Sequence, residues 1–132
     1  MTDTKELKEL MTKYYKAGST ADWTTLQELL HENVVVDEQL AGHLEGHPAM
    51  KALYEGIQKS YKSFDMCPEH MVAEGNEICV GWQVNALTSN GVPIHATGAH
   101  YCRIENGKIV YMTNFHDTIP WKVITASRSD DN

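Results

Sequence analysis

Polar residues suited to acid–base chemistry recur at even spacing along the C-terminal half of the chain. His100, Asn114 and His116 lie in segments where apolar residues occupy every second position. Side chains two residues apart in a strand share a face, so if Trp82 faces inward, the turn after its segment places His100 on the same side. The residues of the last segment expected on that side are Val110, Met112, Asn114 and His116. The pattern predicts a mostly apolar surface that carries proton-transferring and hydrogen-bonding groups, which is typical of an active site.

The N-terminal half can add further polar groups to this surface. Tyr14 lies on the apolar side of a predicted helix, and Asp37 and Glu38 follow a β-branched run. Both positions also have a structural explanation, because aromatic residues are common on the core face of a helix and acids at a strand end are often solvated. The other candidates can likewise be core or local hydrogen-bonding residues: Trp82, His100 and Asn114.

Potential metal ligands are present, but their context does not favour a metal site. His43 and His47 flank Glu45 at a spacing that suits chelation on a helix, yet Gly46 and Pro48 disfavour a continuous helix there. A two-histidine, one-carboxylate set is geometrically conceivable from His100, His116 and Glu38. The sequence shows no Gly-rich phosphate loop, nucleophile elbow or Cys-x-x-Cys motif. We therefore expect no metal and no cofactor.

Length and composition indicate one ordinary globular domain. The chain has 132 residues, 42% of them hydrophobic and 22% charged, with a net charge of -7, and we assign residues 1–121 to the domain and residues 122–132 to a polar tail. The negative charge disfavours nucleic acid and anionic membranes as partners. Since no segment has the ~20 apolar residues of a membrane span, and the three cysteines follow no signal segment and have no paired spacing, we expect a cytoplasmic protein.

The hydrophobic period changes from helical to strand-like along the chain. Apolar residues at positions i, i+3, i+4 and i+7 predict helices over about residues 5–17, 22–31 and 46–61, with Asp22 as a cap. The valines at 34–36 predict a strand between the second and third helices. Alternating segments that predict later strands lie near residues 66–74, 77–86, 94–104 and 108–116.

This order predicts an α+β fold in which three N-terminal helices pack in the concave face of a strongly curved antiparallel sheet. Three helices cannot fill such a sheet, so a cone-shaped cavity for a small hydrophobic molecule is expected. The outer face at positions 79, 81, 83 and 85 is only mildly polar. A homodimer through that face is therefore expected.

Several segments, in this order and spacing, resemble the ketosteroid-isomerase-like, nuclear-transport-factor-2-like (NTF2-like) superfamily, which includes the SnoaL-like polyketide cyclases. They are residues 10–14, 22–34, 46–54 and 105–117, and the resemblance spans about residues 7–117. It implies the fold just described, often as a homodimer. It does not imply one reaction, because isomerases, cyclases, epoxide hydrolases, dehydratases and binding modules share the fold.

The similarity to steroid Δ-isomerases implies roles for individual residues. Tyr14 is similar to the tyrosine that donates to the substrate oxygen, and Glu38 to the carboxylate base, although a one-residue slip would place Asp37 there. His100 stands where those enzymes keep a protonated aspartate as a second oxyanion donor. The residues expected to line the pocket are Asp37, Tyr54, Trp82, Met112 and His116.

We therefore expect a cofactor-independent enzyme that removes a proton next to a carbonyl and stabilises the enolate, as an isomerase or a polyketide- or terpenoid-type cyclase. Glu38 is the expected base, with a pKa raised by desolvation. Tyr14, with His100 or Asn114, is the expected donor to the enolate oxygen. The alternatives are an epoxide hydrolase or dehydratase of the same fold, and a non-catalytic module that binds a hydrophobic ligand or dimerises.

Overall fold

A computed structural model describes residues 3–122, so all of the predicted tail except Lys122 lies outside the described residues. Within this range the chain forms three α-helices, six β-strands and one 3₁₀ turn. In chain order they are α1 (Thr4–Ser19), α2 (Trp23–Leu29), β1 (Leu30–Glu38), β2 (Gly42–Glu45), α3 (Gly46–Ser60), β3 (Tyr61–Glu74), β4 (Glu77–Thr88), β5 (Pro93–Glu105), β6 (Lys108–His116) and η1 (Ile119–Trp121). No helix in the described range is long and apolar enough to cross a membrane.

Local chemistry sets where the helices begin and end. The side chain of Asp22 accepts a hydrogen bond from the amide of Thr25 at 3.3 Å and caps α2 as predicted. This helix ends earlier than expected, because Leu30 is already extended and starts β1. Gly46 begins α3 with a φ of +82°, a left-handed conformation that favours glycine, directly after β2.

The strands form one mixed sheet in the order β2-β1-β6-β5-β4-β3. Neighbouring strands are antiparallel except for β1 and β6, which run parallel. The prediction of an antiparallel sheet is therefore wrong at this pair, and β2 was not predicted at all. Because β2 folds back along one side of β1, the other side of β1 is left to pair with the last strand. The sheet is not strongly curled, so the strong curvature expected from the sequence is not confirmed.

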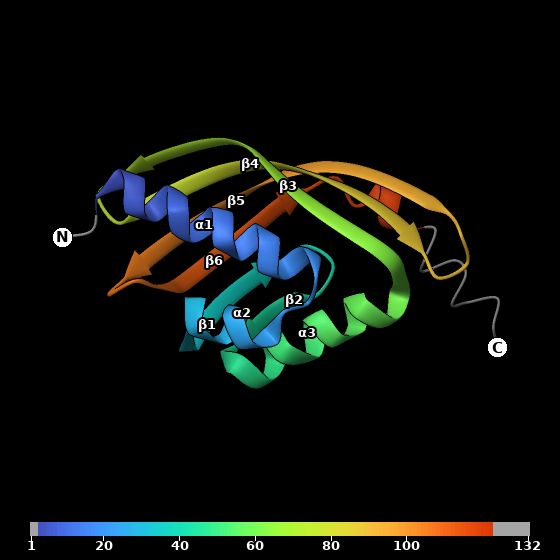
Figure 1. The fold of residues 1–132 in the computed structure, drawn as a ribbon, viewed down its shortest axis with the longest axis horizontal. Helices are drawn as coiled ribbons and strands as arrows, with labels where there is room; N and C mark the ends of the chain where they lie inside the picture. The colour runs from blue at the N-terminus through green and yellow to red at the C-terminus, as the bar shows by residue number, and fades with distance from the viewer. Residues whose placement is uncertain (1–2, 123–132) are drawn as a thin grey trace.

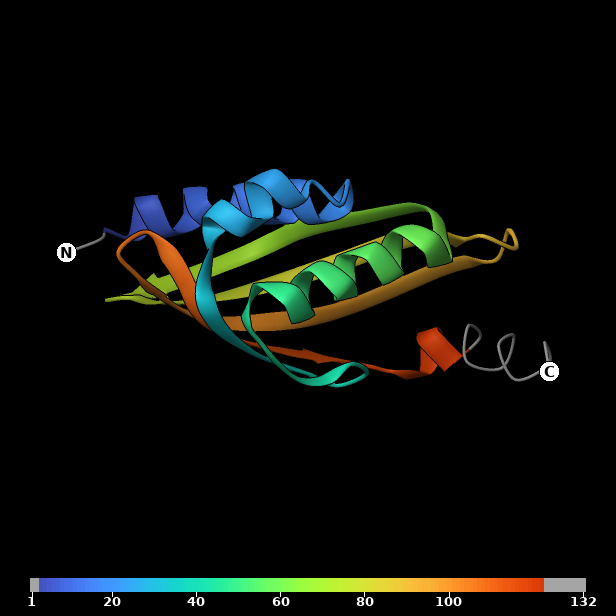
Figure 2. The same cartoon turned by 90° about the horizontal axis from the view of Figure 1, so that it is seen from below.

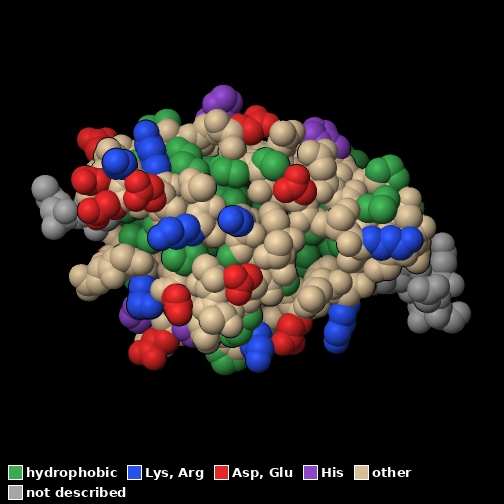
Figure 3. Space-filling view, viewed as in Figure 1, with side chains coloured by type: hydrophobic (Ala, Val, Ile, Leu, Met, Phe, Trp, Pro, Cys, Tyr) green, Lys and Arg blue, Asp and Glu red, His purple; other side chains and the backbone are tan. Residues whose placement is uncertain are grey.

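The helices cover one face of the sheet. Helix α1 packs against β3, and α3 contacts both β1 and β3 (Figures 1 and 2). Acidic and basic side chains intermingle over α1 on the face seen in Figure 3, so the negative charge is not gathered in one patch on that side. The core therefore lies between the helices and the inner face of the strands.

Alternation along β4 predicts its inner face correctly, because residues two apart share a face. The buried residues of this strand are the predicted Ile78, Val80, Trp82, Val84 and Ala86, followed by Thr88 at its end. On β6, a register shift makes Val110 an extra residue between Ile109 and Tyr111, opposite Ile104 and Arg103. Ile109 is buried in its place while Val110 is only half-buried, so the inward prediction for Val110 is wrong.

Candidate active site

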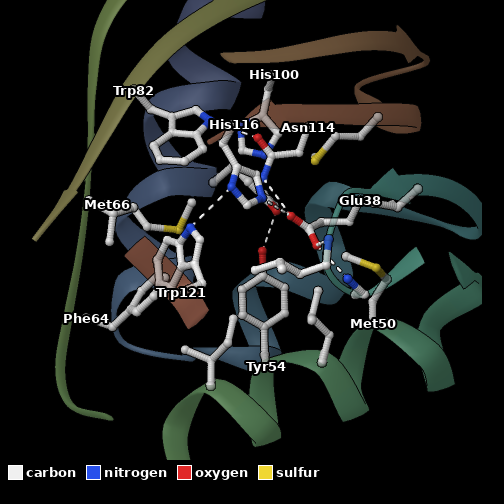
Figure 4. A pocket seen from close by; sticks show the side chains of 18 of the residues that line it. Glu38, Met50, Tyr54, Phe64, Met66, Trp82, His100, Asn114, His116 and Trp121 are labelled. Carbon is white, nitrogen blue, oxygen red and sulfur yellow. Dashed lines mark hydrogen bonds and ion pairs between the residues drawn. The ribbon is translucent and has the colours of Figure 1, made fainter. Parts of the chain in front are cut away.

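A cavity of about 290 Å³ lies between the helices and the inner face of the sheet (Figure 4). The predicted site residues found in its wall are Tyr14, Glu38, Tyr54, Trp82, His100, Met112, Asn114 and His116. The structure adds Leu40 and Ala41 from the β1–β2 turn, Phe64 and Met66 from β3, and Trp121 from η1. Most of the wall is apolar. Tyrosine hydroxyls come from α1 and α3, and the carboxylate, imidazole and amide groups come from β1, β5 and β6.

Asp37 does not line the cavity. It precedes Glu38 on β1, so its side chain points to the opposite face of the sheet. There its Oδ2 accepts a hydrogen bond from the hydroxyl of Tyr111 at 2.9 Å, and its Oδ1 lies 2.7 Å from Nδ1 of His43. The pocket-lining prediction for Asp37 is wrong, and Glu38 is the acid of this pair that faces the cavity.

Both carboxylate oxygens of Glu38 accept hydrogen bonds. Oε1 accepts from Nε2 of His116 and, at 3.4 Å, from Nδ2 of Asn114, whereas Oε2 accepts from the amides of Leu40 and Ala41 at 2.6 and 2.7 Å. Burial alone would raise the pKa of Glu38, but the hydrogen bonds from His116 and the two amides outweigh it and leave the pKa below its ordinary value. The raised pKa expected from desolvation is therefore wrong, and Glu38 is ionised at neutral pH.

His116 is bonded through both ring nitrogens. Nε2 carries a proton, because it faces an ionised carboxylate that can only accept. Nδ1 lies 3.2 Å from the indole N–H of Trp121, which can only donate, and 3.0 Å from the carbonyl oxygen of Asp117, which can only accept. In the neutral ring, Nδ1 therefore accepts a hydrogen bond from the indole of Trp121. In the doubly protonated ring, Nδ1–H donates to the carbonyl oxygen of Asp117 instead. Burial opposes the charge, but the bonds to Glu38 and Asp117 raise the pKa of His116.

Two tyrosine hydroxyls meet in the cavity wall. The hydroxyl of Tyr14 on α1 is hydrogen-bonded to that of Tyr54 on α3, and in Figure 4 the Tyr54 hydroxyl points toward Glu38 and His116. Burial raises the pKa of Tyr14 well above its usual range and that of Tyr54 to about 12, so both are protonated at neutral pH. One proton serves the bond between the two hydroxyls, which leaves the other available to a ligand.

His100 and Asn114 connect the polar groups to the aromatic wall. Burial lowers the pKa of His100 to about 3, so its ring is neutral, and its Nδ1 lies 2.5 Å from the hydroxyl of Tyr15. Oδ1 of Asn114 accepts from the indole N–H of Trp82 at 3.0 Å, while its amide nitrogen reaches Glu38. Asn114 therefore joins Trp82 to the carboxylate.

Gly98 allows the aromatic wall to pack this closely. A Cβ atom at this position would lie 2.4 Å from Cζ2 of Trp82, 2.5 Å from the carbonyl oxygen of Phe115 and 2.7 Å from Cβ of His116. Such distances are far shorter than ordinary carbon contacts. The absence of a side chain on β5 at Gly98 thus places Trp82 beside His116.

Sequence reasoning missed Tyr15 and Trp121. Tyr15 lies four residues after Met11, which belongs to the apolar stripe of α1, so helical periodicity could have identified it. Trp121 lies in η1, beyond the last predicted strand, where no periodic pattern marks a buried residue. It nevertheless packs against Tyr61 and Phe64 at ring distances of 6.2 Å and helps to close the cavity.

The chain belongs to the SnoaL-like domain family, whose sequence profile matches residues 11–112. Its expected membership in the NTF2-like superfamily is thereby confirmed. No match was found among curated proteins.

Solved structures share the fold over nearly their whole length. A candidate polyketide cyclase from Xanthomonas campestris is 19% identical with a TM-score of 0.82, covering 91% of this chain and 96% of that one. An NTF2-like protein of unknown function from Burkholderia pseudomallei is 18% identical with a TM-score of 0.81, covering 94% and 98%. IdmH, a candidate polyketide cyclase from Streptomyces antibioticus, is 18% identical with a TM-score of 0.78, covering 90% and 97%. At these identities the likeness establishes the fold alone.

Proposed function

We propose that this protein is an acid–base enzyme that removes a proton next to the carbonyl group of a small, neutral, largely apolar molecule, as an isomerase or a polyketide- or terpenoid-type cyclase. The observation that carries the proposal is the pairing of Glu38 with His116 inside a mostly apolar cavity, where their side chains are 14% and 2% exposed. Burying a charged pair costs several kcal/mol per ion before compensation. A pocket that only held an apolar molecule would not need it.

Glu38 is the proposed base. The proton on the carbon next to the carbonyl passes to its carboxylate, and the electron pair of the broken C–H bond enters the enolate. Return of the proton to another carbon gives an isomer, whereas attack of the enolate carbon on a second carbonyl forms a ring. When a ring forms, the new alkoxide oxygen takes the proton that Glu38 holds. His116 donates its Nε2–H to Glu38 and supports that carboxylate, and this contact raises the pKa of His116 above its ordinary value.

The lowered pKa of Glu38 makes it a weak base, so the enolate must be strongly stabilised. The Tyr14–Tyr54 hydroxyl pair has one proton available to a ligand, and His100 on β5 offers a ring nitrogen beside Tyr14. Preorganised donors of this kind are worth a few kcal/mol each in a dry cavity. These groups are therefore the proposed binding site of the enolate oxygen.

The cavity wall supports a neutral, flat substrate. Among the described residues that form it there is no lysine or arginine, so an anion next to Glu38 would be unpaired. The aromatic side chains in the wall include Tyr61, Phe64, Trp82 and Trp121. The naming of two proteins of the same fold as candidate polyketide cyclases is consistent with such a substrate.

The test uses deuterium incorporation, which detects proton abstraction whether the enzyme isomerises or cyclises. A panel of cyclic ketones and enones in D₂O is followed by NMR with and without the protein. We expect the protein to exchange the hydrogens next to the carbonyl faster than buffer does. In Glu38→Gln the exchange rate should fall by at least about 100-fold. Asp37→Asn is the matched control, because it changes the neighbouring acid on the outer face, and it should retain the wild-type rate.

A binding module for a hydrophobic ligand is the second candidate. It is favoured by the saturation of both Glu38 oxygens with donors, which suits a fixed ion pair as well as a base. Wild-type protein that binds a panel ketone without catalysing exchange would establish this candidate and overturn the enzyme. An inactive Asp37→Asn beside an active Glu38→Gln would overturn the choice of base.

A further inference from the structure

Tyr15 is a buried tyrosine that takes no part in the chemistry described above. It lies on α1 with 1% of its surface exposed, and its hydroxyl is 2.5 Å from Nδ1 of His100 on β5, which is 3% exposed. Within residues 3–122 the structure gives this hydroxyl no other partner. The two side chains therefore depend on each other for hydrogen bonding.

The contact determines where the proton of His100 lies. A buried phenol proton needs an acceptor, and the ring nitrogen Nδ1 is the one within reach. Tyr15 therefore donates to Nδ1, which must be unprotonated. A neutral imidazole with an unprotonated Nδ1 carries its proton on Nε2.

We propose that Tyr15 is a positioning residue that holds His100 in its Nε2–H form, so that this nitrogen donates a hydrogen bond to the oxygen of a ligand in the cavity. The ring of His100 forms part of the cavity wall. With Nδ1 turned to α1, Nε2 is the nitrogen left to meet a ligand. The inference rests on the proposed function in one respect: the ligand oxygen is that of a carbonyl on its way to an enolate.

The choice of proton position decides whether His100 attracts or repels that oxygen. In the Nε2–H form the ring presents a donor, whereas in the Nδ1–H form it would present a lone pair to an oxygen that carries lone pairs of its own. Burial also keeps the ring uncharged at neutral pH, so His100 acts as a donor that does not give up its proton. The structure therefore favours His100 as a hydrogen-bond donor over a role in which it transfers a proton.

The first test reads the proton position directly and needs no substrate. Long-range ¹H–¹⁵N NMR of protein labelled with ¹⁵N-histidine distinguishes the two neutral forms, and His100 is assigned by its absence in His100→Asn. We expect the Nε2–H form in the wild type at neutral pH and a mixture of both forms in Tyr15→Phe. Tyr101→Phe is the matched control: it removes a hydroxyl bonded to Glu77, on the neighbouring β5 position that faces away from the cavity.

The wild-type spectrum alone can overturn the proposal, even if Tyr15→Phe does not fold. An Nδ1–H form of His100 in the wild type refutes it. So does a pure Nε2–H form in a folded Tyr15→Phe, because the proton position would then not depend on Tyr15.

The second test measures the donor with 4-nitrophenol, whose phenolate oxygen resembles that of an enolate and whose ionisation is visible by absorbance. It uses the Glu38→Gln background, which removes the carboxylate that would repel a phenolate. We expect binding to Glu38→Gln and to Glu38→Gln with Tyr101→Phe, and about 10-fold weaker binding to Glu38→Gln with Tyr15→Phe, the order of one misdirected hydrogen bond to a charged oxygen. Equal affinity with Tyr15→Phe, or no binding to Glu38→Gln, refutes the donor role. Binding with the expected spectrum but without deuterium exchange into ketones would overturn the proposed enzyme and leave the role of Tyr15 standing.

Discussion

Acidification should destabilise the protein through His100. Burial lowers the pKa of this residue to about 3 in the folded protein, against 6.5 for an exposed histidine. Between these values the unfolded chain binds a proton that the native protein does not, so stability falls as the pH falls, by about 1.4 kcal/mol for each pH unit. From neutral pH to about pH 5 the loss from His100 is roughly 2 kcal/mol.

The assay is urea unfolding of the wild type and His100→Asn at about pH 7.5 and pH 5. Other groups titrate in both proteins and cancel in the comparison. They include His116, whose raised pKa acts in the opposite direction: its contribution is present below the unfolded value of 6.5 and is lost as the pH rises through the folded value. We expect the wild type to lose about 2 kcal/mol more than the variant. If the free energy of unfolding falls by the same amount in both proteins, within about 0.5 kcal/mol, His100 is not a neutral buried residue.

Three further predictions concern packing, capping and assembly. Gly98→Ala should destabilise by about 1–3 kcal/mol or more in thermal unfolding, because its Cβ would overlap Trp82 and the carbonyl of Phe115; an unchanged Tm would show that the wall can yield. Asp22→Ala should cost about 1 kcal/mol in urea unfolding through the lost cap on Thr25, and Asp22→Asn should restore most of it. We also propose that the protein is a homodimer through the outer face of the sheet; light scattering should report twice the chain mass, and a mass near 14.9 kDa at high micromolar concentration would exclude it.

The parts of the fold that depend on neighbouring residues could be predicted from the sequence. The inner face of β4 follows from the alternation around Trp82, and the start of α2 from the cap at Asp22. The parallel pairing of β1 with β6 could not be predicted, because periodicity shows which residues share a face but not the direction of a distant partner. The extra residue at Val110 could not be predicted either, because a bulge leaves no mark in the local strand propensity.

The sequence could predict which residues form the candidate site better than it could predict their pKa values. Strand parity and the family resemblance together placed His100 and Asn114 beside Glu38 in one cavity. Parity alone could not choose between Asp37 and Glu38, because the strand boundary was uncertain by one residue. The lowered pKa of Glu38 depends on the amides of Leu40 and Ala41, which the β1–β2 turn supplies, and on the ring of His116, which reaches Glu38 only after β1 and β6 pair.

The pairing of β1 with β6 also decides when, during folding, the Glu38–His116 pair can form. Glu38 and His116 are 78 residues apart in the chain and become neighbours only when these two strands lie side by side. Closing so long a loop loses more chain entropy than forming a local helix or hairpin. Contacts of this kind are therefore slow to form. A partly folded chain with its helices and the β3–β4–β5 meander in place would hold an apolar pocket without its acid–base pair. Under the proposed function, deuterium exchange would then report completion of the whole sheet, whereas binding of an apolar dye would already report the meander.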